Sequence, residues 1–170
     1  MRIGTLLERA DNTARILETK YQDPVSLQRL KTTQDLQENA DSAFFDFYHW
    51  AALLRSVSAF EIYRQIYSDQ ITPQKAAELL IFNRQMPRSL RYCVGDLIPL
   101  LGEIRNQNSK EIERLIGKLQ ADLDYSDINE VFNIGLEEFT KQFLKRINHI
   151  GDELSNAFLI PLAEIGRAHV

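Results

Sequence analysis

The sequence predicts an all-α fold, a multi-helix bundle of about five or six helices in which the long helices are antiparallel. Only 7 of the 170 residues are glycine and 5 are proline, so turn signals are too few for a many-stranded sheet. Apolar side chains recur at helical spacing over most of the chain, and capping residues precede several of these segments. The length is typical of a single domain.

Composition excludes several classes of function. The formal net charge is -4 and no run of five like charges occurs, which argues against a nucleic-acid partner. No apolar run approaches the ~20 residues that span a bilayer, so no membrane association is expected. Cys93 is the single cysteine and can form no internal disulfide. A cytoplasmic location is therefore expected.

The first helix is predicted to run from about Ile3 to Tyr21, ahead of the Asp23-Pro24 pair. Its apolar residues share one arc: Ile3, Leu6, Leu7, Ala10, Ala14 and Leu17. An adjacent arc is polar: Glu8, Asp11, Asn12, Arg15 and Glu18. The following stretch, Val25 to Asp41, is predicted to be a loop or a short helix.

The second helix is predicted from Phe44 to Ser68 and carries most of the aromatic mass, so it should lie in the core. The third is predicted from about Pro73 to Asn83, because Thr72 can cap it and proline suits the first helical position. The segment NRQMPRS is predicted to be a break.

The fourth helix is predicted from about Arg88 to Asn106, with one apolar side facing the core. Pro99 lies inside it. Its ring would crowd the carbonyl of Gly95, so a kink is expected at that point.

Two further helices are predicted in the last third of the chain. Asn108 and Glu111 have capping-box spacing, which predicts a fifth helix that ends near Tyr125. Asp127 stands in a similar position at the start of a final helix, which is predicted to continue through about Phe158.

Both ends of the chain are expected to be non-native or incomplete. One codon choice for residues 164–170, GAG ATC GGA AGA GCA CAC GTC, contains the start of a common sequencing adapter. We therefore expect a helical domain over 1–163 and an adapter-derived tail over 164–170, with the natural gene continuing. Helical periodicity is already running at Ile3 without a preceding cap, so the first residues are also expected to be incomplete.

The polar arc of the first helix is one candidate site. Glu8, Asp11, Asn12 and Arg15 fall together there, and Asp11 and Arg15 are four residues apart. The alternative is a solvated face in which each ion pair contributes roughly 0.2–0.5 kcal/mol.

A second candidate lies on the predicted aromatic helix, where Glu61 shares an azimuth with Trp50, Leu54 and Val57. A carboxylate on that apolar arc needs a partner, since burial of a lone charge is unfavourable by roughly several kcal/mol of free energy. Arg64 can supply it. The pair is either a structural ion pair or part of a polar pocket in which Glu61 acts as acid, base or ligand.

The third candidate surrounds the predicted start of the fourth helix. Its members are Asn83, Arg84, Arg88, Ser89 and Arg91. Guanidinium groups together with free backbone amides suit an anion. The alternative is a basic loop that pairs with the acidic first helix.

No cofactor or metal is expected. Walker and dinucleotide glycine motifs are absent from the sequence, as is Cys/His spacing for a metal. A di-iron bundle needs two Glu-x-x-His pairs, and the chain offers one aspartate variant, Asp46-x-x-His49. Cys93 lies on an apolar helix face and is predicted to be a core residue.

Three segments together resemble the bacterial alpha-E family. They are LLERADNTARIL at 6–17, WAALLRSVSAFEIYR at 50–64 and LLIFNRQMPRSLRYC at 79–93. Their order and approximate spacing are similar too, and the resemblance covers most of the chain. Family members are considerably longer, so the resemblance implies an N-terminal fragment. The aromatic-rich turn usual at the family's start is shortened here to MRIGTL.

The resemblance also implies partners and site positions. The family is similar to proteins encoded beside an ATP-grasp type ligase and a transglutaminase-like peptidase. Its charged motif positions correspond to Glu8, Arg9, Asp11, Asn12, Arg15, Arg55, Glu61, Arg64, Arg84, Arg88 and Ser89.

The expected function is an accessory or substrate-binding helical partner in a bacterial ATP-grasp-linked peptide ligation or modification system. Arg15, Arg64 and Arg88 would hold a carboxylate or phosphate of a peptide or small anion, and Glu8 and Glu61 an amine. Two alternatives stay open. One is an enzyme with Glu61 as general base, and the other is a structural protein–protein interaction module. Convergence of the charged residues on one cleft would favour a site, and dispersal would favour the structural module.

Overall fold

The computed structural model describes residues 2–19, 38–68 and 70–159, and those residues form helices and short connections without a strand. The all-α prediction is confirmed. The described residues contain eight helices rather than five or six: α1 (Arg2–Thr19), α3 (Glu38–Ser56), α4 (Phe60–Tyr67), α5 (Pro73–Phe82), α6 (Leu90–Glu103), α7 (Ser109–Tyr125), α8 (Ile128–Ile134) and α9 (Leu136–Leu159).

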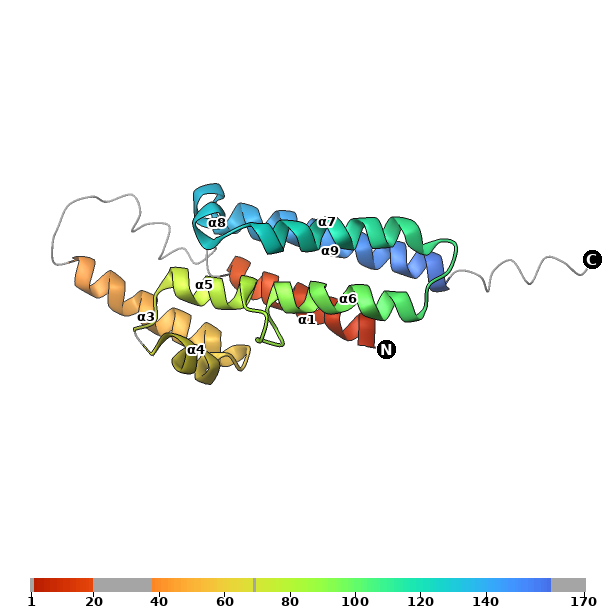
Figure 1. Cartoon of the computed structure of the whole chain (residues 1–170). Helices are drawn as coiled ribbons and strands as arrows, with labels where there is room; N and C mark the ends of the chain where they lie inside the picture. Colours follow the sequence, from red (N-terminus) through yellow and green to blue (C-terminus); the bar gives the residue numbers. More distant parts are fainter. Residues whose placement is uncertain (1, 20–37, 69, 160–170) are drawn as a thin grey trace, which may run out of the picture.

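Four helices, α1, α6, α7 and α9, form an antiparallel bundle (Figure 1). α1 packs against α6 and α9, and α7 packs against the same two helices. Each helix buries one apolar stripe, as the periodicity predicted. The stripe of α1 comprises Leu6, Ala10, Ala14 and Leu17. The bundle thus places α1 beside α6, although 70 residues of chain, 20–89, separate them.

The remaining helices lie at the end of the bundle away from the start of α1 (Figure 1). α5 contacts α3, α4, α6, α7 and α8, and so joins this end to the bundle. Trp50 and Tyr63 are buried here. The Tyr63 hydroxyl donates to the carbonyl of Gln70 at 3.0 Å and accepts from the Thr72 amide at 3.3 Å, which fixes the connection into α5.

The predicted second helix is in fact two helices, α3 and α4. Ser58 between them has a left-handed backbone, with φ of 57°. The Ala59 amide donates to the carbonyl of Leu54 at 2.7 Å, and the Ser58 amide to that of Arg55 at 3.0 Å. This pair of bonds is a Schellman motif, which ends α3. Helical phase is therefore lost between residues 57 and 60, and an azimuth extrapolated from Trp50 to Glu61 is wrong.

The predicted final helix is divided as well. Asp127 caps α8 as predicted, because its Oδ1 accepts from the amides of Asn129 at 2.7 Å and Glu130 at 3.0 Å. α8 then ends at Gly135, whose φ of 98° favours glycine. α9 begins at the next residue and reaches Leu159.

Other boundaries are mixed in outcome. Thr72 caps α5 through the Lys75 amide, as predicted. Asn108 makes no capping bond with its side chain, so the predicted capping box is wrong. The Asn106 side chain accepts from the Asn108 amide at 2.9 Å instead, and the Ser109 hydroxyl accepts from the Asn106 amide.

Some predictions stay untested. Pro99 lies inside α6, and its kink remains a prediction. The segment 25–41 falls outside the described residues up to 37, and its last residues belong to α3. The tail predicted at 164–170 also lies outside the described residues. None of the described helices combines the length and apolarity that crossing a membrane requires.

Candidate functional site: a pocket between α1 and α6

The polar arc predicted on α1 faces largely outward. Glu8, Asn12 and Arg15 are exposed, and Asp11 is half-buried. Arg15 Nε donates to Asp11 Oδ2 at 2.7 Å, and this bond together with the carboxylate charge raises the pKa of Arg15. The other oxygen, Asp11 Oδ1, is buried and has no hydrogen-bond partner among the described residues. This arc is thus a surface face with one internal ion pair.

Glu61 does not lie in the apolar core. It is exposed on α4, and its predicted burial is wrong because α3 ends before it. Arg64 and Arg55 are exposed as well. The Arg55 guanidinium lies over the Phe60 ring, 4.3 Å from its centroid. In the described part of the chain, Glu61 and Arg64 form no ion pair, so the predicted buried pair is absent there.

The break between α5 and α6 is held by its own polar groups. Buried Ser89 caps α6 by accepting from the Tyr92 amide at 3.0 Å, and its hydroxyl donates to the Asn83 carbonyl. The buried Thr13 hydroxyl of α1 donates to the Arg88 carbonyl at 2.8 Å. Ser89 therefore fixes the start of α6, and the bond between Thr13 and Arg88 ties this start to α1.

The arginines of this break pair with α7. Arg84 Nη2 lies 3.2 Å and Arg91 Nε 2.7 Å from the same oxygen, Oδ1 of Asp124. These contacts differ from the alternative in which the basic loop pairs with the acidic first helix. Arg88 is exposed.

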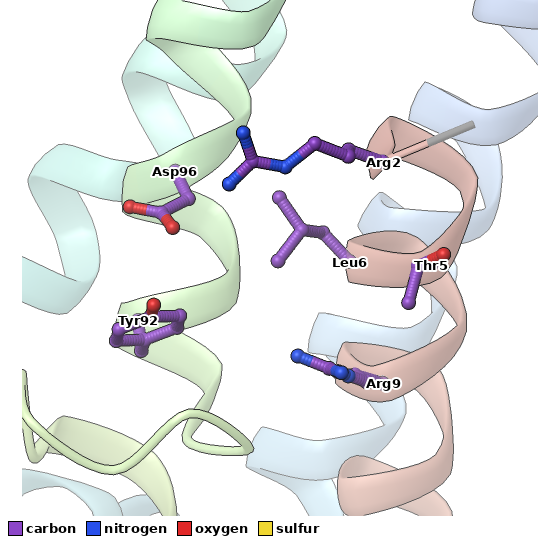
Figure 2. A pocket seen from close by; sticks show the side chains of 6 residues that line it. All are labelled: Arg2, Thr5, Leu6, Arg9, Tyr92 and Asp96. Carbon is purple, nitrogen blue, oxygen red and sulfur yellow. The ribbon is translucent and has the colours of Figure 1, made fainter.

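A pocket of about 260 Å³ opens between α1 and α6. Figure 2 shows its two walls. The α1 wall consists of Arg2, Thr5, Leu6 and Arg9, and the α6 wall of Tyr92 and Asp96. The guanidinium groups of Arg2 and Arg9 extend from α1 towards α6, so cationic groups face a phenol and a carboxylate (Figure 2).

The charged groups of this pocket are not consumed by internal pairing. Within the described residues, Arg2, Arg9 and Asp96 take part in no ion pair. Each of these arginines shares its wall with apolar Leu6 and can bind an anion without first breaking an ion pair. The arrangement suits a carboxylate or phosphate on one side and a hydrogen-bond donor on the other.

The pKa of the buried Cys93 thiol on α6 is also affected by charges near this pocket. It is fully buried, and desolvation raises the pKa of its thiol to about 12. The nearby charges of Arg9 and Arg88 act in the opposite direction, while Asp96 adds to the rise. Burial is therefore the largest influence on the pKa of this thiol, ahead of the charges of Arg9 and Arg88.

A second pocket, of about 240 Å³, lies between α6 and α7. Tyr92 and Asp96 line it as they line the first pocket. Its other lining residues are Arg84, Arg91, Gly95, Gln120 and Asp124.

The two pockets gather residues that sequence reasoning mostly missed. Of the residues named from the sequence, Arg84 and Arg91 line the second pocket, and Arg9, a position implied by the family resemblance, lines the first; the other candidate site residues line neither. A usable signal was present, since Arg2, Thr5 and Arg9 are spaced i, i+3 and i+7 on one helix edge, and Tyr92 and Asp96 are four residues apart.

Comparison with known proteins identifies the family. A family model described as "a predicted alpha-helical domain with a conserved ER motif", named Alpha-E, matches residues 1–159. The chain belongs to the Alpha-E family. No curated protein and no solved structure matches the chain.

The Alpha-E description draws attention to Glu-Arg pairs. This Alpha-E chain has two of them, Glu8-Arg9 and Glu113-Arg114. The first pair lies in the segment on which the family resemblance rests. Its arginine lines the α1–α6 pocket, and its glutamate is exposed beside it.

Proposed function

We propose that this Alpha-E domain is a substrate-binding partner in an ATP-grasp-linked peptide ligation or modification system. Its ligand is a peptide or small anion whose carboxylate or phosphate is held between α1 and α6. The observation that carries the binding role is the pair Arg2 and Arg9, which lines the pocket without ion pairs among the described residues. The link to an ATP-grasp ligase and a transglutaminase-like peptidase rests on family resemblance alone.

The chemistry of the pocket supports binding of a ligand with two kinds of group. Guanidinium groups form paired, charge-assisted hydrogen bonds with carboxylates and phosphates. Asp96 on the opposite wall can accept from an ammonium or amide N–H, and the Tyr92 hydroxyl can donate or accept. The proposed anion-binding residues are therefore Arg2 and Arg9 in place of Arg15, Arg64 and Arg88.

A structural interaction module is the alternative with a specific observation in its favour. Glu8, Glu61 and Arg88 line neither of the two pockets, and several predicted charges are paired internally, such as Arg15 with Asp11. In that case the charged positions serve folding and docking. An enzyme based on Glu61 has less support, since this carboxylate is exposed on α4.

The binding role is tested by NMR titration of the full chain with N-acetylglutamate. Arg9→Gln is expected to weaken the affinity roughly 10–100-fold, because a hydrogen bond to a charged group contributes about 1.5–3 kcal/mol. Arg15→Gln is the matched control on the same helix and should leave the affinity unchanged. Equal affinity of Arg9→Gln and the wild type would contradict the proposal and favour the structural module.

Two further variants separate the alternatives. Arg88→Glu reverses a charge outside both pockets and should reduce binding less than Arg9→Gln; the opposite order would return Arg88 to the site. A turnover assay with Glu61→Gln addresses the enzyme alternative. Turnover by the wild type that the substitution abolishes would replace the binding proposal with a catalytic one.

A further inference from the structure

The two pockets adjoin each other on opposite sides of α6. Tyr92 and Asp96 line both pockets, so these two side chains of α6 stand where the pockets adjoin. Gly95 lies within that stretch and lines the second pocket. Because Gly95 has no side chain, the second pocket reaches the α6 backbone beside these two residues.

Nothing in the packing requires glycine at position 95. A Cβ built there would meet a single atom within 4 Å, Gln120 Nε2 at 4.0 Å, and the backbone is helical. Glycine disfavours a helix interior, so this position lowers local stability without a packing benefit. Gly151 on α9 is similarly uncrowded but lines neither pocket, which makes it a suitable reference position.

The charges along the two pockets alternate in sign. Arg2 and Arg9 stand at one end, Asp96 in the middle, and Arg84 and Arg91 with Asp124 at the other end. Two guanidinium groups share the one carboxylate of Asp124, which leaves positive charge in excess there. Four arginines against two aspartates give the lining residues a net positive charge, while the whole chain has a net charge of -4.

We propose that the two pockets form one groove across α6 that binds an extended acidic peptide segment. One carboxylate lies at Arg2 and Arg9, a second lies at Arg84, and the peptide backbone crosses α6 at Tyr92 and Asp96 and enters the second pocket beside Gly95. Backbone N–H groups of the ligand donate to Asp96. This inference rests on the proposed function, because the first pocket is the same, and it adds the substrate class and a second subsite.

A peptide fits the charge pattern better than a polyphosphate chain does. Asp96 stands between the two arginine clusters and would repel an anion of uniform charge. A peptide with acidic side chains at its ends offers neutral N–H donors in between, which match the central carboxylate. The exposed Arg84 side chain can turn to a ligand more readily than the largely buried Arg91.

The test compares two ligands on the full chain. The longer probe is a blocked peptide, acetyl-Glu-Ser-Gly-Ser-Glu-amide, and the shorter is N-acetylglutamate. The peptide should bind the wild type at least about tenfold more tightly, since it occupies both subsites. Gly95→Leu should remove that gain by filling part of the second pocket, and it should leave binding of N-acetylglutamate in the first pocket unchanged. Arg84→Gln should remove most of the gain.

Controls make the outcomes distinct. Gly151→Leu introduces the same side chain on α9 and should keep the full gain, and thermal melting of both leucine variants verifies that they fold. A peptide with glutamine at both ends should also lose the gain. If Gly95→Leu keeps it, or the peptide binds no better than N-acetylglutamate, the single groove is wrong while the first pocket stands. If neither ligand binds, both proposals fall.

Discussion

The two polar edges of α1 differ in where their charges go. The outer edge, Glu8, Asp11, Asn12 and Arg15, faces solvent and closes one ion pair on itself. The inner edge consists of Arg2, Thr5, Arg9 and Thr13. It faces α6: Arg2, Thr5 and Arg9 line the pocket, and Thr13 bonds to the Arg88 carbonyl.

This difference shows what a cluster of charges in a sequence can and cannot indicate. Charged residues lie closer together in the sequence on the outer edge. At this spacing, residues of opposite charge at i and i+4 can pair within one helix. Charges that pair locally need no other helix. The inner edge is sparser in sequence but meets residues some 80 positions away, and only the fold brings these together.

The largest expected effect in this comparison concerns Thr13. Thr13→Val removes the hydrogen bond to the Arg88 carbonyl at a buried position and should lower the free energy of unfolding by about 1–3 kcal/mol. Thr19→Val makes the same substitution on the same helix, where the hydroxyl is exposed and bonds locally to Ile16, and should cost less than about 0.5 kcal/mol. Urea denaturation measures both. Equal losses would mean that the inner edge does not anchor α1 to α6.

An intermediate effect concerns Cys93, which lies behind the inner edge. Its folded-state pKa is raised from an ordinary 9.0 to about 12, chiefly by burial. Between these values the unfolded thiol loses its proton and the folded one retains it, so stability should fall as pH rises. The slope is at most about 1.4 kcal/mol per pH unit, and this contribution is constant below pH 8 or so.

The measurement compares wild type with Cys93→Ala from about pH 8 to pH 10, since this difference cancels the other groups that titrate there. Wild type should lose stability more steeply. Parallel curves would indicate that water, or the charges of Arg9 and Arg88, reach the sulfur more effectively than its burial suggests.

The smallest expected effect concerns Arg15. Arg15→Gln breaks the ion pair with Asp11 on the outer edge, where the Arg15 side chain is exposed. We expect an unfolding midpoint close to that of wild type, with little change on addition of salt, because solvent already screens the pair. A loss as large as that of Thr13→Val would reverse the ranking of the two edges.

Most of the fold follows from the sequence, and the exceptions have physical reasons. Periodicity, Thr72 and Asp127 located α1 and the starts of α5 and α8. The break at Ser58 was missed because serine is not a usual residue for a left-handed backbone. The helix end at Gly135 was also missed, because a single glycine in a helical pattern is compatible with either continuation or termination of the helix.

The site was less accessible to sequence reasoning. Azimuth arguments hold only within one helix, so the orientation assigned to Glu61 was lost once α3 ended. Arg9 was noticed only as part of the family resemblance, although its spacing from Arg2 already placed both on one edge. That Tyr92 and Asp96 lie opposite this edge depends on how α1 packs on α6, which no local pattern specifies.

The Thr13–Arg88 bond joins residues 75 positions apart, and this separation has a kinetic consequence. A loop of this length adds little to the entropic free-energy cost of bringing its ends together, because that cost grows only with the logarithm of loop length. Contacts between distant residues do slow folding, however. α7 and α9 are close in sequence and can pack early in folding. α1 and α6 can pack only after the intervening chain has brought α6 back to α1. A ligand that binds between α1 and α6 would therefore bind only those protein molecules in which the two helices have already packed together.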